Sequence, residues 1–460
     1  MNEEQISILL EKQRKYYKSG ITLSIDFRKK QLKILYKTIK KYELEINDAL
    51  KIDLGKSVYE GYMCEIGLVL SEISYMIRNL KRFSKRKTVP TPLSQFPSRS
   101  YIQPIPYGNT LIMSPWNYPF LLTMDPLVDA IATGNTAIIK PSAYSKETTK
   151  IIKKIINECY LEDYIAVIMG GRKENSALLK QKFDFIFFTG SQAVGKEVLR
   201  QSANYLTPVV LELGGKSPCI VEDSANIELA AKRIVFGKYL NCGQTCVAPD
   251  YILCQKNVKD DFIKEVIKQI KIQFGDNPLN NKDYGKIIND KHFNRLINLI
   301  DNNKVIYGGR INKDKNQISP TVMDNVTEDD NVMQEEIFGP IMPIITYDDF
   351  EIMINSLKNK DKPLALYIFS NNKSHIKKVT NELSYGGGCV NDVVIHLATS
   401  EMGFGGVGES GMGSYHGKAG FDAFSHYKSI VDKKVWLDLP MRYQPYINKF
   451  YERLLRLFLR

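Results

Sequence analysis

The feature that most constrains the fold is an alternation of short apolar runs with helix-length amphipathic stretches, beginning near Thr110. This alternation is typical of strands joined by helices, and it predicts an α/β fold with a mostly parallel sheet. The first block contains predicted strands at 110–113, 136–139, 164–169, 183–188 and 209–213, with helices near 119–132, 145–159, 174–181 and 192–203. A second alternating block, from Ser217 to about Val390, indicates a second α/β domain.

The segments on either side of these blocks have different patterns. Residues 4–50 carry apolar side chains at helical spacing and are interpreted as two helices, and 58–85 continues as helix. Three prolines between residues 90 and 97 then break the helical pattern, which favours an extended arm. Glycine-rich stretches at 386–388 and 403–413 are predicted to be irregular loops close to a site.

Composition excludes several classes of function. The formal charge of +12 is spread along 460 residues, and its densest cluster, at 81–87, has no aromatic side chain beyond Phe83. We therefore expect no nucleic-acid binding. There is no apolar run of roughly 18 residues and no pattern of a signal peptide at the start. The expected compartment is the cytoplasm.

The cysteines point to a reducing environment and not to a disulfide framework. There are seven of them, an odd number, and they are scattered through the chain. Cys242 and Cys246 have the spacing of half a metal site, but no second pair with zinc-like spacing follows and the five histidines do not cluster. No metal site is predicted.

Three short segments carry side chains whose chemistry fits together. Cys246 closes GQTC at 243–246, Glu212 lies in LELGGK at 211–216, and Asn117 lies in PWNYP at 115–119. A thiolate is a strong nucleophile, a carboxylate is a general base, and an amide N–H stabilises a developing oxyanion. Such a set favours a covalent route through a carbonyl substrate. The alternatives are a buried structural cysteine, a surface carboxylate and a turn asparagine.

A further segment has the features of a phosphate site. FTGS at 188–191 ends a predicted strand and begins a helix, and Gly195 follows Gly190 by five positions. A turn of this kind places free N–H groups and a positive helix end beside a pyrophosphate. However, the G-x-G-x-x-G fingerprint of ordinary dinucleotide-binding folds is missing from the first strand.

Together with EEIFGP at 335–340, these segments resemble the signature segments of the NAD(P)-dependent aldehyde dehydrogenases in order and spacing. YKSGIT at 17–22, NDVVIHL at 391–397, FGGVG at 404–408 and GMGSYHG at 411–417 are similar to the class 3 branch. The resemblance runs from about residue 10 to about residue 445. It implies the aldehyde dehydrogenase fold, with a Rossmann-like cofactor domain, an α/β catalytic domain and a small oligomerisation arm.

The resemblance also implies roles for individual residues. Cys246 attacks the aldehyde to give a thiohemiacetal, hydride passes to the cofactor, and water hydrolyses the resulting thioester to a carboxylic acid. Glu212 activates that water, and the Asn117 side chain with the Cys246 N–H forms the oxyanion hole. The expected cofactor-binding residues are Lys140 at the adenosine ribose, Glu336 and Phe338 at the nicotinamide ribose, and Gly190, Ser191 and Gly195 at the pyrophosphate.

One departure from the family pattern bears on the cofactor. Many NAD-preferring relatives have a glutamate three residues after the lysine, whereas this chain has Ala143. A glutamate carboxylate would repel a 2′-phosphate, and alanine does not, while Lys140 is available to pair with one. NADP is therefore expected to be tolerated beside NAD.

The implied domains are a cofactor domain (1–84 and 107–211), a catalytic domain (212–400), an arm that pairs two subunits (85–106 and 415–440) and a carboxyl-terminal amphipathic helix (446–460). That helix places Ile447, Phe450, Leu454 and Phe458 on one side and Lys449, Arg453, Arg456 and Arg460 on the other. Docking on its own chain or on a dimer partner, and contact with a membrane surface, are both open.

The expected substrates are medium- or long-chain aliphatic or aromatic aldehydes. One alternative keeps the fold and releases the thioester to coenzyme A, but such an enzyme does not need Glu212. The other alternative is a non-catalytic dinucleotide-binding or membrane-associated protein, since a fold does not prove an activity.

Overall fold

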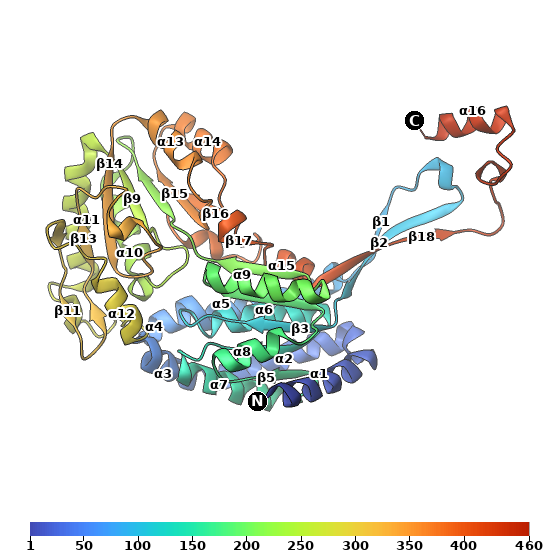
Figure 1. Ribbon diagram of the computed structural model, residues 1–460, viewed down its shortest axis with the longest axis horizontal. Coiled ribbons are helices and arrows are strands. Elements are labelled where there is room, and N and C mark those ends of the chain that lie inside the picture. The colour runs from blue at the N-terminus through green and yellow to red at the C-terminus, as the bar shows by residue number, and fades with distance from the viewer. Residues whose placement is uncertain (460) are drawn as a thin grey trace.

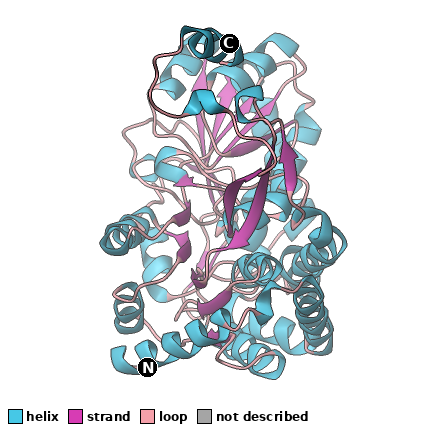
Figure 2. Cartoon of the chain, turned by 90° about the vertical axis from the view of Figure 1, so that its right-hand side faces the viewer, coloured by secondary structure: helices cyan, strands magenta, loops and turns pink. Residues whose placement is uncertain are grey.

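The computed structural model describes residues 1–459, which form two α/β halves and a thin arm that projects from the first half (Figure 1). The first half contains a six-stranded sheet and the second a seven-stranded sheet, while the arm is a three-stranded sheet. The view from the side of the arm shows helices packed around both large sheets (Figure 2). The α/β class predicted from the sequence is confirmed.

Three helices, not the two predicted, occupy the first part of the chain. They are α1 Glu3–Lys18, α2 Ile25–Lys41 and α3 Glu43–Leu54. Asn2 and Ser24 cap α1 and α2 by accepting hydrogen bonds from backbone N–H groups. Gly20 adopts a left-handed φ of 76° and turns the chain after α1. The break between α2 and α3 falls at Tyr42, which carries no helix-stop signal in the sequence.

The helix predicted at 58–85 is interrupted. It consists of α4 Val58–Gly61, a five-residue π-helix η2 Tyr62–Ile66, and α5 Gly67–Phe83. In the π-helix the N–H of Gly67 donates to the carbonyl of Tyr62, one residue further back than in an α-helix. The wider turn rotates the side chains before α5 relative to those within it.

The six-stranded sheet of the first half, in the domain predicted to bind the cofactor, is called the cofactor sheet. It has the order β17-β7-β6-β3-β4-β5, with β17 alone antiparallel to its neighbour. Its strands are β3 Asn109–Met113, β4 Thr136–Lys140, β5 Ile165–Val167, β6 Phe185–Gly190, β7 Val209–Leu213 and β17 Gly411–Met412. All five strands predicted for the first block are present, with small shifts at their ends. The predicted domain boundary between residues 211 and 212 falls inside β7, so Glu212 belongs to this sheet.

Helices cover both faces of the cofactor sheet. Helix α1 packs on one face with α8 Arg172–Leu179 and α9 Gln192–Ser202, against Leu111 and Met113 of β3. Helices α2 and α5 lie on the opposite face with α6 Leu121–Thr133 and α7 Lys146–Cys159, against Ile112. Successive residues of β3 therefore point into two separate apolar layers, as expected of a strand buried on both sides.

The second half has the strand order β10-β13-β14-β9-β8-β15-β16, with β10 alone antiparallel. Its strands are β8 Pro218–Val221, β9 Tyr251–Gln255, β10 Val305–Tyr307, β13 Thr321–Met323, β14 Ile341–Tyr347, β15 Ala365–Phe369 and β16 Gly387–Val390. Its helices are α10 Ile227–Tyr239, α11 Lys259–Phe274, α12 Asp290–Ile297, α13 Phe350–Lys358 and α14 Lys373–Glu382. A short hairpin, β11 Ile311–Asn312 and β12 Gln317–Ile318, lies beside it.

Both glycine-rich stretches predicted to be loops contribute strand residues, since Gly411–Met412 of the second stretch forms β17. Residues 386–388 lead into β16, which pairs in parallel with β15. A Cβ on Gly388 would lie 2.0 Å from the carbonyl oxygen of Leu366, so glycine is needed there for close approach of the two backbones. The glycines indicate tight packing and not an irregular loop.

The arm is the antiparallel sheet β1-β2-β18, formed by β1 Lys87–Val89, β2 Ser98–Pro106 and β18 Ser425–Lys433. Helix α15 Gly417–Ala423 precedes β18 and packs on α5 and α6 of the body. Helix α16 Lys449–Phe458 lies near the outer end of the arm (Figure 1). Arg460, assigned from the sequence to this helix, lies outside the described residues. Among residues 1–459, no helix combines the length and apolarity needed to cross a bilayer.

Candidate active site

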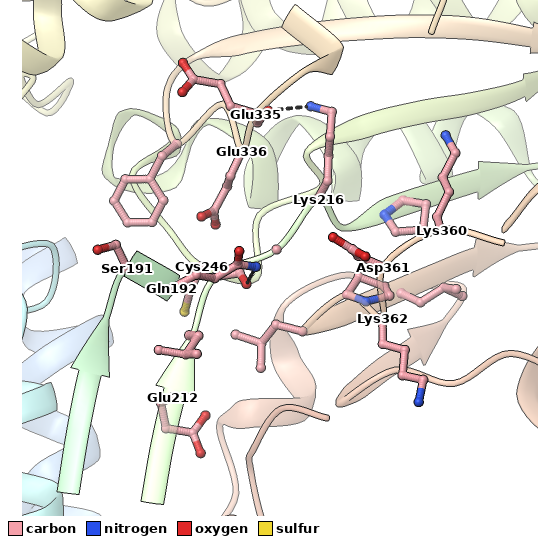
Figure 3. Close-up of a pocket in the computed structure, with 18 of the residues that line it drawn as sticks. Ser191, Gln192, Glu212, Lys216, Cys246, Glu335, Glu336, Lys360, Asp361 and Lys362 are labelled. Atoms are coloured by element: carbon pink, nitrogen blue, oxygen red, sulfur yellow. Dashed lines mark hydrogen bonds between the residues drawn. The ribbon is translucent and has the colours of Figure 1, made fainter. Parts of the chain in front are cut away.

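A cavity of about 820 Å³ lies between the two halves, at the carboxyl ends of β6 and β7 and the amino ends of β8 and β15. Residues predicted from the sequence to form the site lie on its wall: Asn117, Gly190, Ser191, Glu212, Cys246, Glu336 and Phe338. Figure 3 shows Cys246 between Glu336 on one side and Glu212 on the other. Lys140 and Gly195, also predicted, lie outside this wall.

The loop before the nucleophile has an unusual backbone. Asn241, Cys242 and Gly243 have φ values of 51°, 53° and 73°, so three consecutive residues adopt the left-handed conformation. For residues with a Cβ this conformation is costly, and it persists only where surrounding contacts hold it. Gln244 supplies such contacts, because its side-chain amide donates to the carbonyl oxygens of Asn241 and Lys286, both at 3.0 Å.

Glycine is required at position 243 for a second reason. A Cβ there would lie 2.2 Å from the carbonyl oxygen of Gly339, in the loop that carries Glu336 and Phe338. The nucleophile loop and the loop at 335–340 therefore touch through their backbones. This contact fixes the position of Cys246 relative to Glu336.

The environment of Cys246 disfavours a thiolate at rest. Burial raises the pKa of the Cys246 thiol to about 12, and the carboxyl groups of Glu336 and Glu212 add to the shift. The side chain is partly exposed to the cavity, so it remains accessible. The residue has the access that a nucleophile needs, but it must lose its proton before it can attack.

Glu212 is placed as a base with no other bonding task. Its side chain is only 2% exposed, and neither carboxyl oxygen has a hydrogen-bond partner. Burial raises the pKa of Glu212 well above its usual range. A carboxyl group with a raised pKa and free oxygens, beside the nucleophile, is suited to taking a proton from a water molecule.

Asn117 is held so that one amide N–H remains available. Its Nδ2 atom donates to the carbonyl oxygen of Gln244 at 3.1 Å, in the loop that precedes Cys246. An amide nitrogen carries two N–H groups, so one anchors the side chain and the second can face a substrate oxygen. The neighbouring Tyr118 bonds Thr245 through their hydroxyl groups at 2.6 Å, which ties the same two segments together.

The loop at 335–340 is clamped by residues that the sequence did not identify as important. Lys216 donates to the carboxylate of Asp250 at 2.6 Å and to the carbonyl oxygen of Glu335 at 2.9 Å. The other Asp250 oxygen accepts from the N–H of Ile337 at 2.9 Å. Arg295 donates to the carbonyl oxygen of Ile337 at 2.5 Å. Lys216 stood in the LELGGK segment, but nothing in the sequence pairs it with Asp250 or Arg295.

The strand-to-helix turn at Gly190 has the features of a phosphate-binding site. Ser191 is the N-cap of α9, but its side chain makes no capping hydrogen bond, and the hydroxyl of Thr189 is buried without a partner. The first turn of α9 therefore presents N–H groups without intrahelical partners, with the positive end of the helix dipole beside them. These residues fit the pyrophosphate of a dinucleotide.

Three other residues predicted to bind the cofactor lie in different surroundings. Burial raises the pKa of Glu336 to about 8, so this carboxyl gains its charge only near the top of the physiological range. Lys140 ends β4, and its Nζ atom donates to the carbonyl oxygen of Pro141 at 2.8 Å, while burial lowers its pKa to about 8. Gly195 has a packing role, because a Cβ there would lie 2.6 Å from Leu213 Cδ2 and would push α9 away from β7.

The thiol environment predicts how the ligand-free protein reacts with iodoacetamide. Because the pKa of Cys246 is about 12, alkylation should rise continuously from pH 7 to 9, by up to about tenfold per pH unit, without levelling. Glu336→Gln removes a carboxylate that is charged above about pH 8, so it should lower the thiol pKa and accelerate alkylation at pH 9 by up to ~10-fold. Mass spectrometry of the Cys246 peptide measures both rates. A rate that levels off below pH 8 would contradict this electrostatic account.

Comparison with known proteins identifies the family. The chain matches the Aldehyde dehydrogenase family over residues 1–430. It is 48% identical over 437 residues to the 4,4'-diaponeurosporen-aldehyde dehydrogenase of Staphylococcus aureus, covering 95% of both chains. It is 43% identical over 420 residues to mouse Aldehyde dehydrogenase family 3 member A2, covering 91% of this chain and 87% of the relative.

The comparison with solved structures agrees. The substrate-bound state of Staphylococcus aureus AldH has a TM-score of 0.97 with this structure at 46% identity, covering 99% of each chain. The fold and the relatives together confirm the family and branch indicated by the motifs. The chain belongs to the aldehyde dehydrogenase family, in its class 3 branch, and is an oxidoreductase that uses NAD or NADP.

Proposed function

We propose that the protein oxidises medium- or long-chain aliphatic and aromatic aldehydes to carboxylic acids by a hydrolytic route. The observation that carries the hydrolytic assignment is the placement of Glu212. It lies beside Cys246, and its two carboxyl oxygens have no hydrogen-bond partner. An apolar substrate is supported by the cavity wall, which includes Leu122, Phe404 and Tyr415. The Staphylococcus aureus relative is named for 4,4'-diaponeurosporen-aldehyde.

The first steps follow from the positions of Cys246 and Asn117. The deprotonated sulfur bonds the aldehyde carbon, and the carbonyl π-electrons move to the oxygen. The free N–H of Asn117 and the backbone N–H of Cys246 hold that oxyanion, and loss of one such donor typically costs ~10²–10³-fold in turnover. A bound nicotinamide coenzyme supplies the oxidation by accepting a hydride. Glu336 and Phe338, in the clamped loop, and the N-terminus of α9 are the groups that would hold it.

Glu212 acts in the second half of the reaction. It takes a proton from water as the water oxygen bonds the thioester carbon, and the Cys246 sulfur leaves with its electron pair. A coenzyme A acceptor would use its own thiol as the attacking group and would not need this base. The buried position of Glu212 on β7 therefore favours water over coenzyme A.

Both coenzymes are proposed to bind. Ala143 is exposed and follows Lys140 near the carboxyl end of β4, where no carboxylate from position 143 opposes a 2′-phosphate. The pKa of Lys140 is about 8, so it is largely charged at neutral pH and can pair with that phosphate. The residues support dual use of NAD and NADP.

A homodimer joined through the arm is supported by two free strand edges. β18 is an outer strand of the arm sheet and β16 is an outer strand of the seven-stranded sheet. Val431 on β18 is 52% exposed and Val390 on β16 is 43% exposed. Exposed edges with apolar side chains are normally covered, and a second copy of this chain would cover them.

The carboxyl-terminal helix is proposed to contact an anionic membrane surface. Phe450 and Leu457 of α16 are each 62% exposed, and Lys449, Arg453 and Arg456 add positive charge. Such a basic amphipathic helix suits the headgroup layer. A cytoplasmic, membrane-peripheral location is compatible with the seven cysteines, all of which are free thiols.

The hydrolytic route is tested by following NADH and NADPH formation with aldehydes from short aliphatic to long-chain and aromatic. Wild-type protein should turn over the apolar aldehydes without coenzyme A. Glu212→Gln should lower kcat by ~10²–10⁴-fold and leave a burst of one equivalent per site, because thioester formation does not need this base. Turnover that requires coenzyme A would contradict the hydrolytic route.

Ala143→Glu tests the basis of coenzyme choice. A carboxylate at this position should repel the 2′-phosphate and lower kcat/KM for NADP by ~10–100-fold, because like charges in contact cost a few kcal/mol. The value for NAD should change little. Steady-state kinetics with each coenzyme, using Ala143→Gln as the uncharged control, measures the difference. Equal losses for both coenzymes would place position 143 away from the 2′-phosphate.

A chain ending at Lys434 tests the dimer and the membrane contact together. This chain keeps the arm strands that are proposed to join two subunits, and it loses α16. It should therefore still form a dimer, with twice the mass of one chain by light scattering. It should also fail to sediment with phosphatidylglycerol vesicles, which the full chain should bind in a salt-sensitive manner. A monomeric full chain would contradict the dimer. Failure of the full chain to bind vesicles would instead favour docking of α16 on protein.

A further inference from the structure

A fully buried ion pair lies directly behind the oxyanion donor. Lys56 and Glu65 have side chains with no solvent exposure, and Lys56 Nζ lies 2.5 Å from Glu65 Oε1. The same Nζ atom donates to the backbone carbonyl oxygen of Asn117 at 3.0 Å and lies 3.9 Å from the centre of the Tyr118 ring. Neither Lys56 nor Glu65 forms part of the cavity wall, so neither can touch a substrate there.

We propose that Lys56 and Glu65 are positioning residues that hold the amide of Asn117 in place against the nucleophile loop. This inference rests on the oxyanion role proposed for Asn117. It assigns a function in the reaction to the first 65 residues of the chain, none of which lines the cavity.

The contacts of Glu65 extend the support to the whole segment around Asn117. Its second oxygen, Oε2, accepts from the backbone N–H of Phe120 at 2.8 Å and of Leu121 at 3.2 Å. These N–H groups lie at the start of α6, where a helix has donors without partners and its dipole is positive. Lys56 therefore holds the carbonyl group of Asn117, and Glu65 holds the backbone that follows it at the start of α6.

The local backbone directs the Glu65 side chain toward the start of α6. Glu65 lies in the π-helix η2, whose extra residue per turn shifts side-chain directions relative to an α-helix. π-Turns are rare, and they are frequently found at functional sites. In a regular α-helix over 58–83, Glu65 would face a different direction relative to the residues of α5.

The support also reaches the loop that carries Cys246. Asn241 donates through Nδ2 to the carbonyl oxygens of Asn117 at 2.8 Å and Gln244 at 3.1 Å. The backbone N–H of Asn241 donates to Glu60 Oε1 at 3.0 Å, one turn before the π-helix. The segment 56–65 thus forms hydrogen bonds both to the backbone around Asn117, through Lys56 and Glu65, and to the strained loop before Cys246, through Glu60.

A charge pair in this position is an unusual way to gain stability. Removing two ions from water is costly, and apolar side chains of similar size often serve a core as well or better. An ion pair does define direction, because its hydrogen bonds fix the atoms they join. The need to fix the position of the Asn117 amide accounts for a buried ion pair, and not an apolar pair, at this place.

The test is a double-mutant cycle on kcat with an aldehyde substrate and saturating coenzyme. Lys56→Met should lower kcat by ~10–100-fold, and Asn117→Ala by ~10²–10³-fold. If Lys56 acts through Asn117, the Lys56→Met/Asn117→Ala protein should be no slower than Asn117→Ala alone. The dissociation constant for NADH, from its fluorescence, should stay within about twofold in all three proteins.

Two controls separate positioning from loss of folded protein. Each kcat is expressed per alkylatable Cys246, so that unfolded molecules do not count. Lys259→Met disrupts a comparable pair, Lys259–Asp324 at 3.0 Å, whose side chains are 18% and 13% exposed and which lies outside the cavity wall. It should lower the melting temperature without changing kcat per site. If Lys56→Met alone does not fold, Lys56→Met/Glu65→Gln removes both charges and enters the same cycle.

The possible outcomes are distinct. Losses from Lys56→Met and Asn117→Ala that multiply in the combined protein would overturn the positioning role, as would full kcat per site in Lys56→Met or in the charge-free pair. An Asn117→Ala protein with wild-type kcat would instead remove the oxyanion role itself, which is a failure of the proposed function. A loss from Lys56→Met that disappears in the Asn117→Ala background supports the inference.

Discussion

Desolvation of the cavity between the two sheets is the constraint on which the rest of the site depends. Burial raises the pKa of Cys246 to about 12 and that of Glu336 to about 8, so these two groups rest largely in their protonated forms at neutral pH, and burial also raises the pKa of Glu212. In this state the thiol is a weak nucleophile, and the neighbouring Glu336 carboxyl carries little charge. In the proposed reaction a proton must leave Cys246 before the attack, and Glu212 must be in its carboxylate form before it can take a proton from water during hydrolysis.

A cavity of this kind works only if its groups are held by their backbones, because the reacting side chains have few bonds of their own. The structure provides two such supports. Lys216, Asp250 and Arg295 hold the loop of Glu336 and Phe338, and Lys56 with Glu65 holds Asn117. Both supports consist of hydrogen-bonded charged groups. Lys56 and Glu65 lie outside the cavity wall, whereas Lys216 and Arg295 form part of it and direct their hydrogen bonds to the loop.

The sequence was sufficient for features that depend on local pattern or on a motif. Periodic apolar residues located the five parallel strands of the cofactor sheet but not β17, and the motifs located Cys246, Glu212 and Asn117, which the structure brings to one cavity. Features that depend on distant partners could not be predicted. The pairing of Lys216 with Asp250 spans 34 positions, and the π-helix that delivers Glu65 follows the same apolar spacing as its neighbours. Glycines 386–388 indicate a loop by composition, yet their role is close packing of strands, which only the partner strand reveals.

We propose that Cys246 carries the acyl group and that Glu212 releases it to water. Acid-quenching Glu212→Gln protein seconds after mixing with NAD and a long-chain aldehyde, followed by mass spectrometry of its peptides, tests this division of roles. The Cys246 peptide of the variant should gain the mass of the acyl group. Wild-type protein, quenched in the same way, should show much less of this adduct. An unmodified Cys246 peptide in the variant, while NADH has formed, would show that Cys246 does not carry the acyl group.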